Sequence, residues 1–369
     1  MTKKNIVVGA GFSGAAIANL TANKLNEKVV VVDRKNHIAG NSFDYRDKNG
    51  IMIHKYGSHI FHTNNEKVWK FVREFSEFNQ YMHKVYAVID GIETTIPFNF
   101  NTISDVFPKS LAKRLEEKLL MRFEYNKKIP ILEFQKQDDK DLKFLSNYVY
   151  EKVFLHYTTK QWGVSPDDID GCITARVPVY LSKDNRYFQD KYQGIPLKGY
   201  TKLIEKMLNH PNIEVRLNTE FKDIKDKYDR VFYTGAIDEY FNYRLGQLPY
   251  RSVHFETEEY EREFYQNNSV VNYPCNYDFT RIHEYKYYLN DKSDKTVIVK
   301  EYSESFEIGK NERYYPILNN ETIKLYEQYL ELAKKEDNVY FLGRLGDYKY
   351  YDMDKAILRA IELFDEVCL

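Results

Sequence analysis

The sequence predicts an α/β fold in which a discontinuous, nucleotide-binding Rossmann-like domain carries an inserted helical bundle and an antiparallel β-sheet domain. Three observations predict it. A strand, a glycine-rich turn, a helix and a second strand follow one another within residues 5–34. Strand-like segments that end in glycine return far along the chain, at 229–236 and 338–346. The residues between them show helical periodicity in one stretch and strand-like alternation in others.

The N-terminal segment carries the strongest single motif. The continuous β-branched run at 6–8 is typical of a strand buried on both faces, and the G-x-G-x-x-G turn follows it. Such glycines allow a tight turn and let a pyrophosphate approach the backbone, at a helix start whose N–H groups attract phosphate. A second strand at 29–32 ends at Asp33, whose carboxylate suits a ribose 2′-hydroxyl. The predicted dinucleotide contacts are Gly9, Gly11, Ser13, Gly14 and Asp33. A glycine-tightened βαβ unit without a ligand is the alternative.

A second glycine turn follows the ribose acid, in the segment RKNHIAGN at 34–41. It resembles the extended fingerprint of the large FAD-binding family that includes amine oxidases and glutathione reductase. In those proteins the chain runs beside the pyrophosphate at this point. FAD is therefore the predicted cofactor, with Arg34 and Asn41 as further contacts.

The remaining segments complete the domain prediction. Residues 104–157 are helix-rich, and alternating aromatic and β-branched patterns in 84–97 and 252–301 predict the antiparallel sheet. A closing helix carries Met353, Ile357, Ile361, Phe364 and Val367 on one face. The predicted domains are a FAD-binding domain of residues 1–80, 196–250 and 317–369, a helical domain of residues 101–180 with a mobile loop at 176–188, and a sheet domain for substrate of residues 81–100, 181–195 and 251–316.

Composition narrows the class of function. The net charge is −1, from 54 basic and 55 acidic residues, which predicts no nucleic-acid or membrane partner. Three widely spaced cysteines predict no metal site and fit a reducing compartment. No apolar run is long enough for a signal peptide or a membrane span, so we expect a cytoplasmic protein. The 33 tyrosines suit sugar or nucleotide clefts, although a compositional bias explains them equally well.

The stretch FLHYTTKQWG, 154–163, holds one of only two tryptophans. It sets Trp162 and Tyr157 among threonine, lysine and glutamine side chains. A flat aromatic surface surrounded by hydrogen-bonding groups suits a flat polar ligand. The alternative is that Trp162 anchors an interface between domains.

Several longer motifs extend this pattern over nearly the whole chain. They are VVGAGFSGA, HKYGSHIFHT, IPFNFNT, YTTKQWG, RYFQDKYQGIPLKGYTKLIEKML, YTGAIDEYF, ERYYPI and GRLGDYKYYDMDKAI. With them the chain resembles the bacterial UDP-galactopyranose mutase family. The resemblance implies an FAD-dependent isomerase, usually a homodimer, that interconverts UDP-galactopyranose and UDP-galactofuranose for cell-surface glycans.

The resemblance also implies roles for individual residues. Arg176 and Arg281 would grip the diphosphate, which a forked guanidinium suits well, and with His59 they are the implied catalytic residues. Tyr157 would stack on uracil. The implied substrate contacts are His83, Phe154, Tyr157, Thr158, Trp162, Arg176, Tyr187, Asn272, Arg281, Tyr315 and Tyr350. The implied flavin contacts are His59, Ile60, Arg344, Tyr350, Asp352 and Met353.

The implied chemistry needs no net redox change. In the family, N5 of reduced FAD attacks C1 of the sugar and expels UDP, the ring opens and recloses through O4, and UDP returns. A reductant such as NAD(P)H would only prime the flavin. Because His83 stands where some relatives carry asparagine, UDP-N-acetylgalactosamine remains an alternative substrate. A flavin oxidoreductase of the amine-oxidase type and a non-catalytic nucleotide-binding protein are further alternatives.

Overall fold

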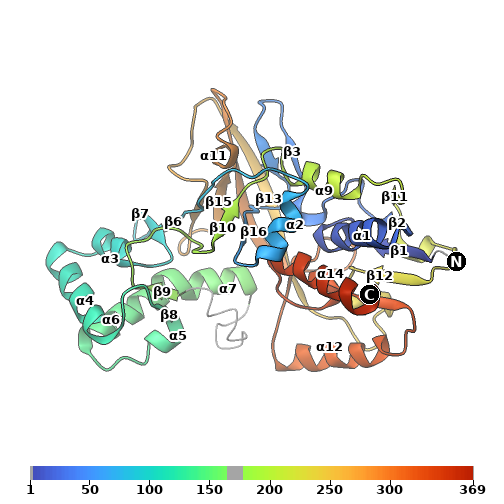
Figure 1. Ribbon diagram of the computed structural model, residues 1–369. Helices are drawn as coiled ribbons and strands as arrows, with labels where there is room; N and C mark the ends of the chain where they lie inside the picture. The colour runs from blue at the N-terminus through green and yellow to red at the C-terminus, as the bar shows by residue number, and fades with distance from the viewer. Residues whose placement is uncertain (1–2, 164–177, 369) are drawn as a thin grey trace. The chain divides into compact units, whose positions relative to one another are not determined.

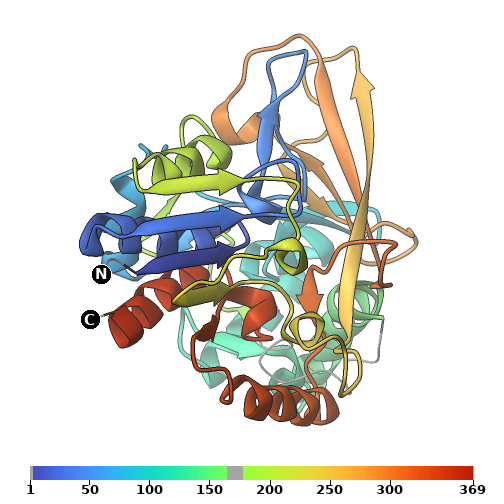
Figure 2. The same ribbon diagram turned by 90° about the vertical axis from the view of Figure 1, so that its right-hand side faces the viewer.

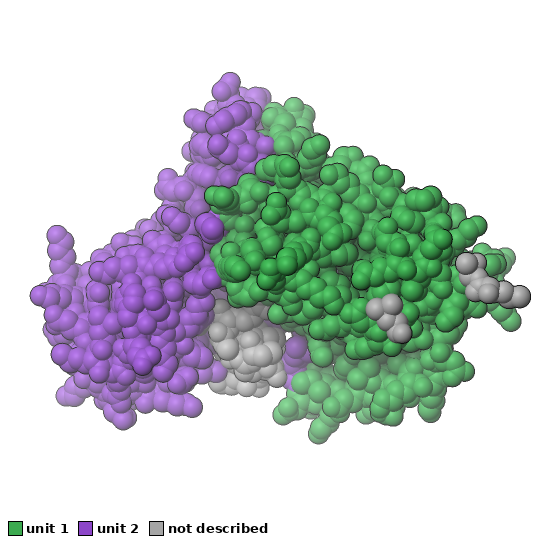
Figure 3. Space-filling model, viewed as in Figure 1, with its two compact units in different colours: residues 1–81, 190–250, 320–369 green, residues 82–189, 251–319 purple. Residues whose placement is uncertain are grey.

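A computed structural model of the protein describes residues 3–163 and 178–368 (Figure 1, and turned by 90° in Figure 2). Contacts within the chain divide it into two compact units (Figure 3). Unit 1 comprises residues 1–81, 190–250 and 320–369, and unit 2 comprises residues 82–189 and 251–319. Residues of the predicted helical and sheet domains together make up most of unit 2.

A parallel sheet forms the centre of unit 1, as the Rossmann prediction requires. Its strand order is β11-β2-β1-β12-β18, and the neighbouring strands are parallel. Val7 lies opposite Val31 on one side and Phe232 on the other. The strands are β1 (Lys4–Val8), β2 (Lys28–Val32), β11 (Ile213–Arg216), β12 (Arg230–Tyr233) and β18 (Val339–Phe341).

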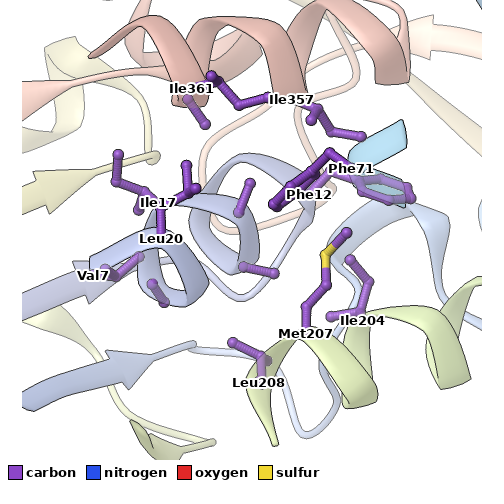
Figure 4. Packing of buried hydrophobic residues seen from close by; sticks show 14 of the residues in the cluster. Val7, Phe12, Ile17, Leu20, Phe71, Ile204, Met207, Leu208, Ile357 and Ile361 are labelled. Atoms are coloured by element: carbon purple, nitrogen blue, oxygen red, sulfur yellow. The ribbon is translucent and has the colours of Figure 1, made fainter. Parts of the chain in front are cut away.

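Helices cover the face of this sheet that carries Val7. Helix α1 (Phe12–Leu25) packs between α14 (Met353–Cys368) and α9 (Tyr200–Leu208) (Figure 4). Ile17 of α1 and Ile357 of α14 are fully buried there. Burial of each such side chain stabilises the fold by about 1.5–3 kcal/mol. This packing fixes the start of α1, where the glycine turn lies.

Short elements complete unit 1. Strand β10 falls within 181–195, which the sequence assigned to the sheet domain, but it pairs with β5 in unit 1. The short elements are β3 (Asp44–Arg46), β4 (Met52–His54), β5 (Phe61–Thr63), β10 (Tyr192–Gly194), α2 (Glu66–Arg73), α10 (Ile237–Tyr240), α12 (Asn320–Ala333), α13 (Gly343–Gly346) and 3₁₀ turns at Gly40–Ser42 and Phe221–Asp223.

Unit 2 contains a second sheet, with strand order β17-β13-β16-β15-β14-β6-β7. The pairings β13–β16, β16–β15, β15–β14 and β6–β7 are antiparallel, as predicted. The pairing of β14 with β6 is parallel, so the sheet departs from the predicted antiparallel arrangement at this pairing. The strands are β6 (Val85–Ile89), β7 (Ile92–Ile96), β13 (Tyr250–Tyr260), β14 (Val270–Asn272), β15 (Arg281–Glu284), β16 (Thr296–Ser305) and β17 (Tyr315–Pro316).

The helices of unit 2 share one hydrophobic core with the β6–β7 end of the sheet. A π-helical turn at Tyr150–Leu155 joins α6 to α7. The remaining elements are α3 (Phe100–Val106), α4 (Lys109–Arg122), β8 (Lys128–Pro130), α5 (Ile131–Phe134), α6 (Lys140–Val149), α7 (His156–Trp162), β9 (Pro178–Tyr180) and α11 (Lys286–Leu289). In the described part of the chain, no helix is long and apolar enough to cross a bilayer.

Candidate active site

The glycine turn of unit 1 leaves no room for a side chain at two of its three glycines. Gly9 has φ +102°, and a Cβ there would lie 2.0 Å from Oγ1 of Thr234. A Cβ at Gly14 would lie 1.9 Å from the carbonyl oxygen of Gly9. At Gly11 a Cβ would meet only Cα of Gly40, at an ordinary contact distance of 3.8 Å. The space beside Gly11 is therefore where a ligand can approach the backbone.

The start of α1 favours an anion at the same place. No side chain caps the helix at Gly11, and its first turn contains no acidic residue. The unpaired N–H groups of a helix start and the positive end of its dipole stabilise phosphate. Helix and turn together fit the pyrophosphate of a dinucleotide.

The second glycine turn packs directly on the first. The backbone N–H of Ala39 donates to the carbonyl of Ala10 (2.8 Å), and a Cβ at Gly40 would lie only 3.2 Å from Cα of Gly11. Asp33 braces both turns, because its carboxylate accepts from the N–H groups of Ala10 (2.8 Å) and Lys35 (2.9 Å). We call residues 9–14 and 33–41 the glycine cradle. Arg34 lies 3.9 Å from Glu239, and Asn41 accepts from the Lys35 ammonium at 3.3 Å.

A C-terminal segment borders the cradle within unit 1. A Cβ at Gly343 would lie 3.1 Å from Oγ of Ser13, which itself donates to the carbonyl of Ala356 (3.3 Å). Arg344 donates from Nη2 to the carbonyl of Tyr351 (2.6 Å), and its guanidinium lies 5.3 Å from the centre of the Tyr350 ring. Asp352 and Met353 follow at the start of α14. The structure thus brings Gly343, next to predicted Arg344, and Ala356 of α14 against Ser13 at the start of α1.

His59 is held in one tautomer. Its Nδ1 lies 2.8 Å from the carbonyl of Gly57, so Nδ1 carries the proton and Nε2 keeps its lone pair. The backbone N–H of His59 donates to Nδ1 of His54 (3.1 Å), and the Tyr200 ring meets His59 edge-on. Burial first, and then neighbouring His54, lower the pKa of His59 to about 3. The ring is therefore neutral at physiological pH. Ile60, next along the chain, is 9% exposed.

In unit 2, three polar residues lie side by side across neighbouring strands. Asn272 of β14 is directly opposite Arg281 of β15, which is opposite Glu301 of β16. Arg281 donates from Nε to one oxygen of Glu301 at 3.0 Å, and its Nη2 forms an ion pair with the same oxygen, also at 3.0 Å. The other oxygen of Glu301 accepts from Nε2 of His283 at 2.9 Å. Burial alone would raise the pKa of Glu301, but Arg281 and His283 outweigh it and lower the pKa to about 2.

Three tyrosines interact with the same guanidinium, and we call them with Arg281 the phenol cluster. The centre of the Tyr157 ring lies 6.0 Å from the Arg281 guanidinium. The phenols of Tyr157, Tyr187 and Tyr315 all interact electrostatically with Arg281. Burial raises the pKa of Tyr157, which keeps its phenol protonated and able to donate. The Trp162 ring lies 6.0 Å from that of Tyr315. A cation among phenolic donors has the chemistry to bind a multiply charged anion.

Asn272 adds an unsatisfied acceptor at the edge of this cluster. The residue is 6% exposed, and its Oδ1 has no hydrogen-bond partner among the residues that the structure describes. A buried amide oxygen without a donor costs about 1–3 kcal/mol. A ligand that brings a hydroxyl or N–H group would satisfy it.

Hydrogen bonds fix the C-terminal end of helix α7. Gly163 ends it with φ +70°, and Arg251 donates from Nε to the carbonyl of Gln161 at 2.9 Å. The Lys160 ammonium donates to the carbonyls of Tyr273, Tyr277 and Phe279 at 2.5–3.1 Å. Lys160, which the sequence placed among groups around a ligand, therefore binds the chain between β14 and β15.

The other predicted substrate residues have varied environments. Phe154 is 1% exposed in the core of unit 2, and Thr158 is 4% exposed on α7. His83 packs against the rings of Tyr187 (5.8 Å) and Phe188 (5.9 Å). Tyr350 lies in unit 1, and Arg176 lies outside the described residues.

Sequence reasoning missed Glu301 and its partner His283. A signal for Glu301 was present: counting in steps of two along β16, it lies on the same face as buried Val297 and Val299. A carboxylate at a core-facing strand position needs a cationic partner.

Two family models match the chain. One, described as UDP-galactopyranose mutase, matches residues 152–350, which include α7 and the whole phenol cluster. The other, described as an NAD(P)-binding Rossmann-like domain, matches residues 7–75, which include the glycine cradle.

Similar proteins cover the whole chain. It is 40% identical over 373 residues to a probable UDP-galactopyranose mutase of Klebsiella pneumoniae, covering 99% of this chain and 95% of the relative. It is 38% identical over 370 residues to a dTDP-fucopyranose mutase of Escherichia coli, covering 97% of each. The crystal structure of a reduced UDP-galactopyranose mutase is similar in fold, with a TM-score of 0.73 and 16% identity over 100% of this chain and 94% of that one.

Proposed function

The chain belongs to the UDP-galactopyranose mutase family, and from that premise we propose that it is a flavin-dependent isomerase that interconverts UDP-galactopyranose and UDP-galactofuranose. The observation that carries the proposal is the phenol cluster, in which Arg281 lies among three tyrosines and opposite the unsatisfied Asn272. The cluster has the chemistry of a nucleotide-diphosphate site. The product would supply galactofuranose for cell-surface glycans.

The proposed cofactor is FAD, which the glycine cradle fits. The space beside Gly11 and the uncapped start of α1 would hold its pyrophosphate, and Asp33 its ribose. His59, Ile60, Arg344, Tyr350, Asp352 and Met353 would contact the rest of it. In its reduced form, bound flavin would supply the nucleophile for C1 of the sugar.

The chain's own part in the reaction is binding and electrostatics. Arg281, with Arg176, would hold the diphosphate and stabilise the charge that develops on UDP when its bond to C1 breaks. Glu301 holds the Nε edge of the guanidinium and so directs the remaining N–H groups. Tyr157, Tyr187 and Tyr315 would donate O–H groups to phosphate or sugar oxygens.

The nucleotide end of the ligand would lie along α7 and β14. Tyr157 offers a ring on which a pyrimidine can stack, with Thr158 and Trp162 on the same helix. Oδ1 of Asn272 would accept from a donor on the base or the ribose. Phe154 would support this surface from the core.

His59 would act as a neutral hydrogen-bond acceptor beside the flavin. Its Nδ1–H is bound to the Gly57 carbonyl, so the Nε2 lone pair is the part of the ring that would accept from a ligand. We further propose that the enzyme is a homodimer in the cytoplasm, where NAD(P)H can prime the flavin.

The direct test is to purify the full chain, record its flavin spectrum, reduce it and separate the nucleotide sugars formed from UDP-galactofuranose. Conversion to UDP-galactopyranose by the reduced protein alone is the expected result. UDP-N-acetylgalactosamine belongs in the same assay because of His83. dTDP-fucopyranose belongs there because a relative that is 38% identical carries that name. A yellow protein that oxidises amines and does not bind UDP would favour the oxidoreductase alternative instead.

A further inference from the structure

The motif IPFNFNT, 96–102, has no role in the function proposed above, yet its side chains divide sharply between two environments. Phe98 and Phe100 are almost fully buried in the core of unit 2. Asn99 begins α3: its Oδ1 accepts from the N–H groups of Asn101 (2.8 Å) and Thr102 (3.1 Å). The side-chain NH₂ groups of Asn99 and Asn101 can therefore donate to acceptors outside α3.

What they bind is Asn185, on the segment that leads to Tyr187. Oδ1 of Asn185 accepts from Nδ2 of Asn101 (2.7 Å), from Nδ2 of Asn99 (3.0 Å) and from Oγ1 of Thr95 (3.2 Å). A carbonyl oxygen has two lone pairs, so three donors saturate it. The two asparagines also donate to the backbone carbonyls of Asp184 (3.3 Å) and Lys183 (3.0 Å). We call Thr95, Asn99, Asn101 and Asn185 the asparagine clasp.

Residues 184–187 fall within the loop that the sequence predicted to be mobile, yet several hydrogen bonds hold them. Asp184 accepts from Nε and Nη2 of Arg186, with distances of 2.7–3.0 Å, which closes a tight turn around Asn185. The N–H of Tyr187 then donates to the carbonyl of His83 (2.8 Å), and its ring packs edge-on against Phe188. Two fixed points, one on each side of residue 186, therefore set the position of the Tyr187 phenol.

The asparagine clasp costs free energy that an apolar contact at the same place would not cost. It orders several polar side chains in a partly buried place, where each unmade hydrogen bond is expensive. Its result is a defined position for Tyr187, the member of the phenol cluster whose N–H is bound by His83 and whose phenol interacts electrostatically with Arg281. We propose that Asn185 is a positioning residue, which the clasp holds so that Tyr187 is fixed beside the diphosphate site. The inference rests on the proposed function, because it treats that cluster as the nucleotide-diphosphate site.

The test is a double-mutant cycle on UDP binding, measured by calorimetry on the oxidised, full-length protein. Tyr187→Phe removes one hydrogen-bond donor and should weaken UDP binding about twofold to tenfold. In the Asn185→Ala background, the phenol is no longer held, and the same substitution should weaken binding less than about twofold. Asn185→Asp keeps an acceptor for the three donors, so the full effect of Tyr187→Phe should return there.

A matched control separates positioning from general loss of stability. Asn65 caps α2 in unit 1 by accepting from the N–H of Val68 (3.1 Å), and Asn65→Ala should lower the Tm while leaving the effect of Tyr187→Phe unchanged. If Asn185→Ala does not fold, Asn101→Ala takes its place, since it removes one donor and keeps the α3 cap. Equal effects of Tyr187→Phe in all backgrounds would overturn the inference alone. Failure of the unmodified protein to bind UDP would overturn the proposed function as well.

Discussion

Glu301 accepts a hydrogen bond from Nε of Arg281 and so fixes one edge of the guanidinium, whose other edge would face the proposed ligand. The Glu301 carboxylate reduces the local positive charge at Arg281, where we propose that the diphosphate binds. It also fixes the direction of the remaining N–H groups, and a desolvated site depends on that geometry. Because Glu301 is 4% exposed and its pKa is lowered to about 2, this arrangement persists throughout the physiological pH range.

Replacing Arg281 tests the diphosphate assignment. Charge-assisted hydrogen bonds contribute about 1.5–3 kcal/mol each, so Arg281→Ala should lower kcat/KM by roughly a hundredfold or more. Arg176→Ala should act in the same direction. Flavin content should not change, because the glycine cradle is made by unit 1 residues. Arg262→Ala is the control, since Arg262 lies over the Tyr265 ring (4.4 Å) outside the phenol cluster. Normal kinetics in Arg281→Ala would refute the assignment.

The lowered pKa of His59 predicts a specific dependence of stability on pH. The unfolded chain binds a proton at His59 below about pH 6.5, whereas the folded chain does so only near pH 3. His59 therefore contributes full stability above pH 6.5 and progressively less as the pH falls from 6.5 toward 3. Histidine NMR signals should show a neutral His59 with a protonated Nδ1 from pH 8 to pH 5. Titration of that ring with a midpoint near 6.5 would contradict the structure.

At the scale of elements, two glycines of the first turn are required for different reasons: Gly14 for packing of the fold and Gly11 for access of the ligand. Gly14→Ala should destabilise unit 1 strongly, because its Cβ would lie 1.9 Å from a backbone oxygen. Gly11→Ala meets only an ordinary contact at 3.8 Å, so the protein should fold with a nearly unchanged Tm. Its methyl group would occupy the space proposed for pyrophosphate, and flavin absorbance per mole of protein should fall sharply. Full flavin content in Gly11→Ala would place the pyrophosphate elsewhere.

The end of α7 offers a second element-scale test. Gly163 has φ +70°, and an added Cβ would lie 2.6 Å from Nη1 of Arg251. Gly163→Ala should therefore both destabilise unit 2 and weaken UDP binding, since Arg251 holds the helix that carries Tyr157. Gly309→Ala is the matched control in the same unit: its φ is +77° and nothing lies within 4 Å. Backbone strain of about 1–2 kcal/mol is common to both variants, so their difference measures the displaced arginine. Equal losses of stability and of UDP affinity in the two variants would show that the Arg251 side chain moves aside without cost.

The sequence predicted those helices and strands whose pattern lies within one short segment of the chain. The strand, glycine turn and helix over residues 4–25, and the closing helix after 352, follow from periodicity and glycine spacing alone. The parallel pairing of β14 with β6 could not be predicted, because no hairpin turn joins these strands and no turn residue sets their direction. The asparagine clasp was hidden for a similar reason: Asn99 and Asn185 meet only through tertiary packing.

At the scale of the whole molecule, the resemblance anticipated the family, and the Rossmann-like fold is confirmed. Glu301 shows the limit of such reasoning, since its role depends on the register that sets it opposite Arg281. The roles of the individual site residues stay predictions. They share one claim, that unit 2 binds a nucleoside diphosphate sugar and unit 1 a flavin that acts as a nucleophile rather than as an electron carrier.

That claim has one direct measurement, the number of product molecules formed per reducing equivalent. UDP-galactopyranose and UDP-galactofuranose are isomers, so electrons given to the flavin remain on the protein after the product leaves. Under anaerobic conditions, dithionite far below the substrate concentration should support many turnovers, with the flavin spectrum reduced throughout. The oxidised protein should be inactive. Product that forms in step with reductant or oxygen consumed would contradict the account and establish an oxidoreductase.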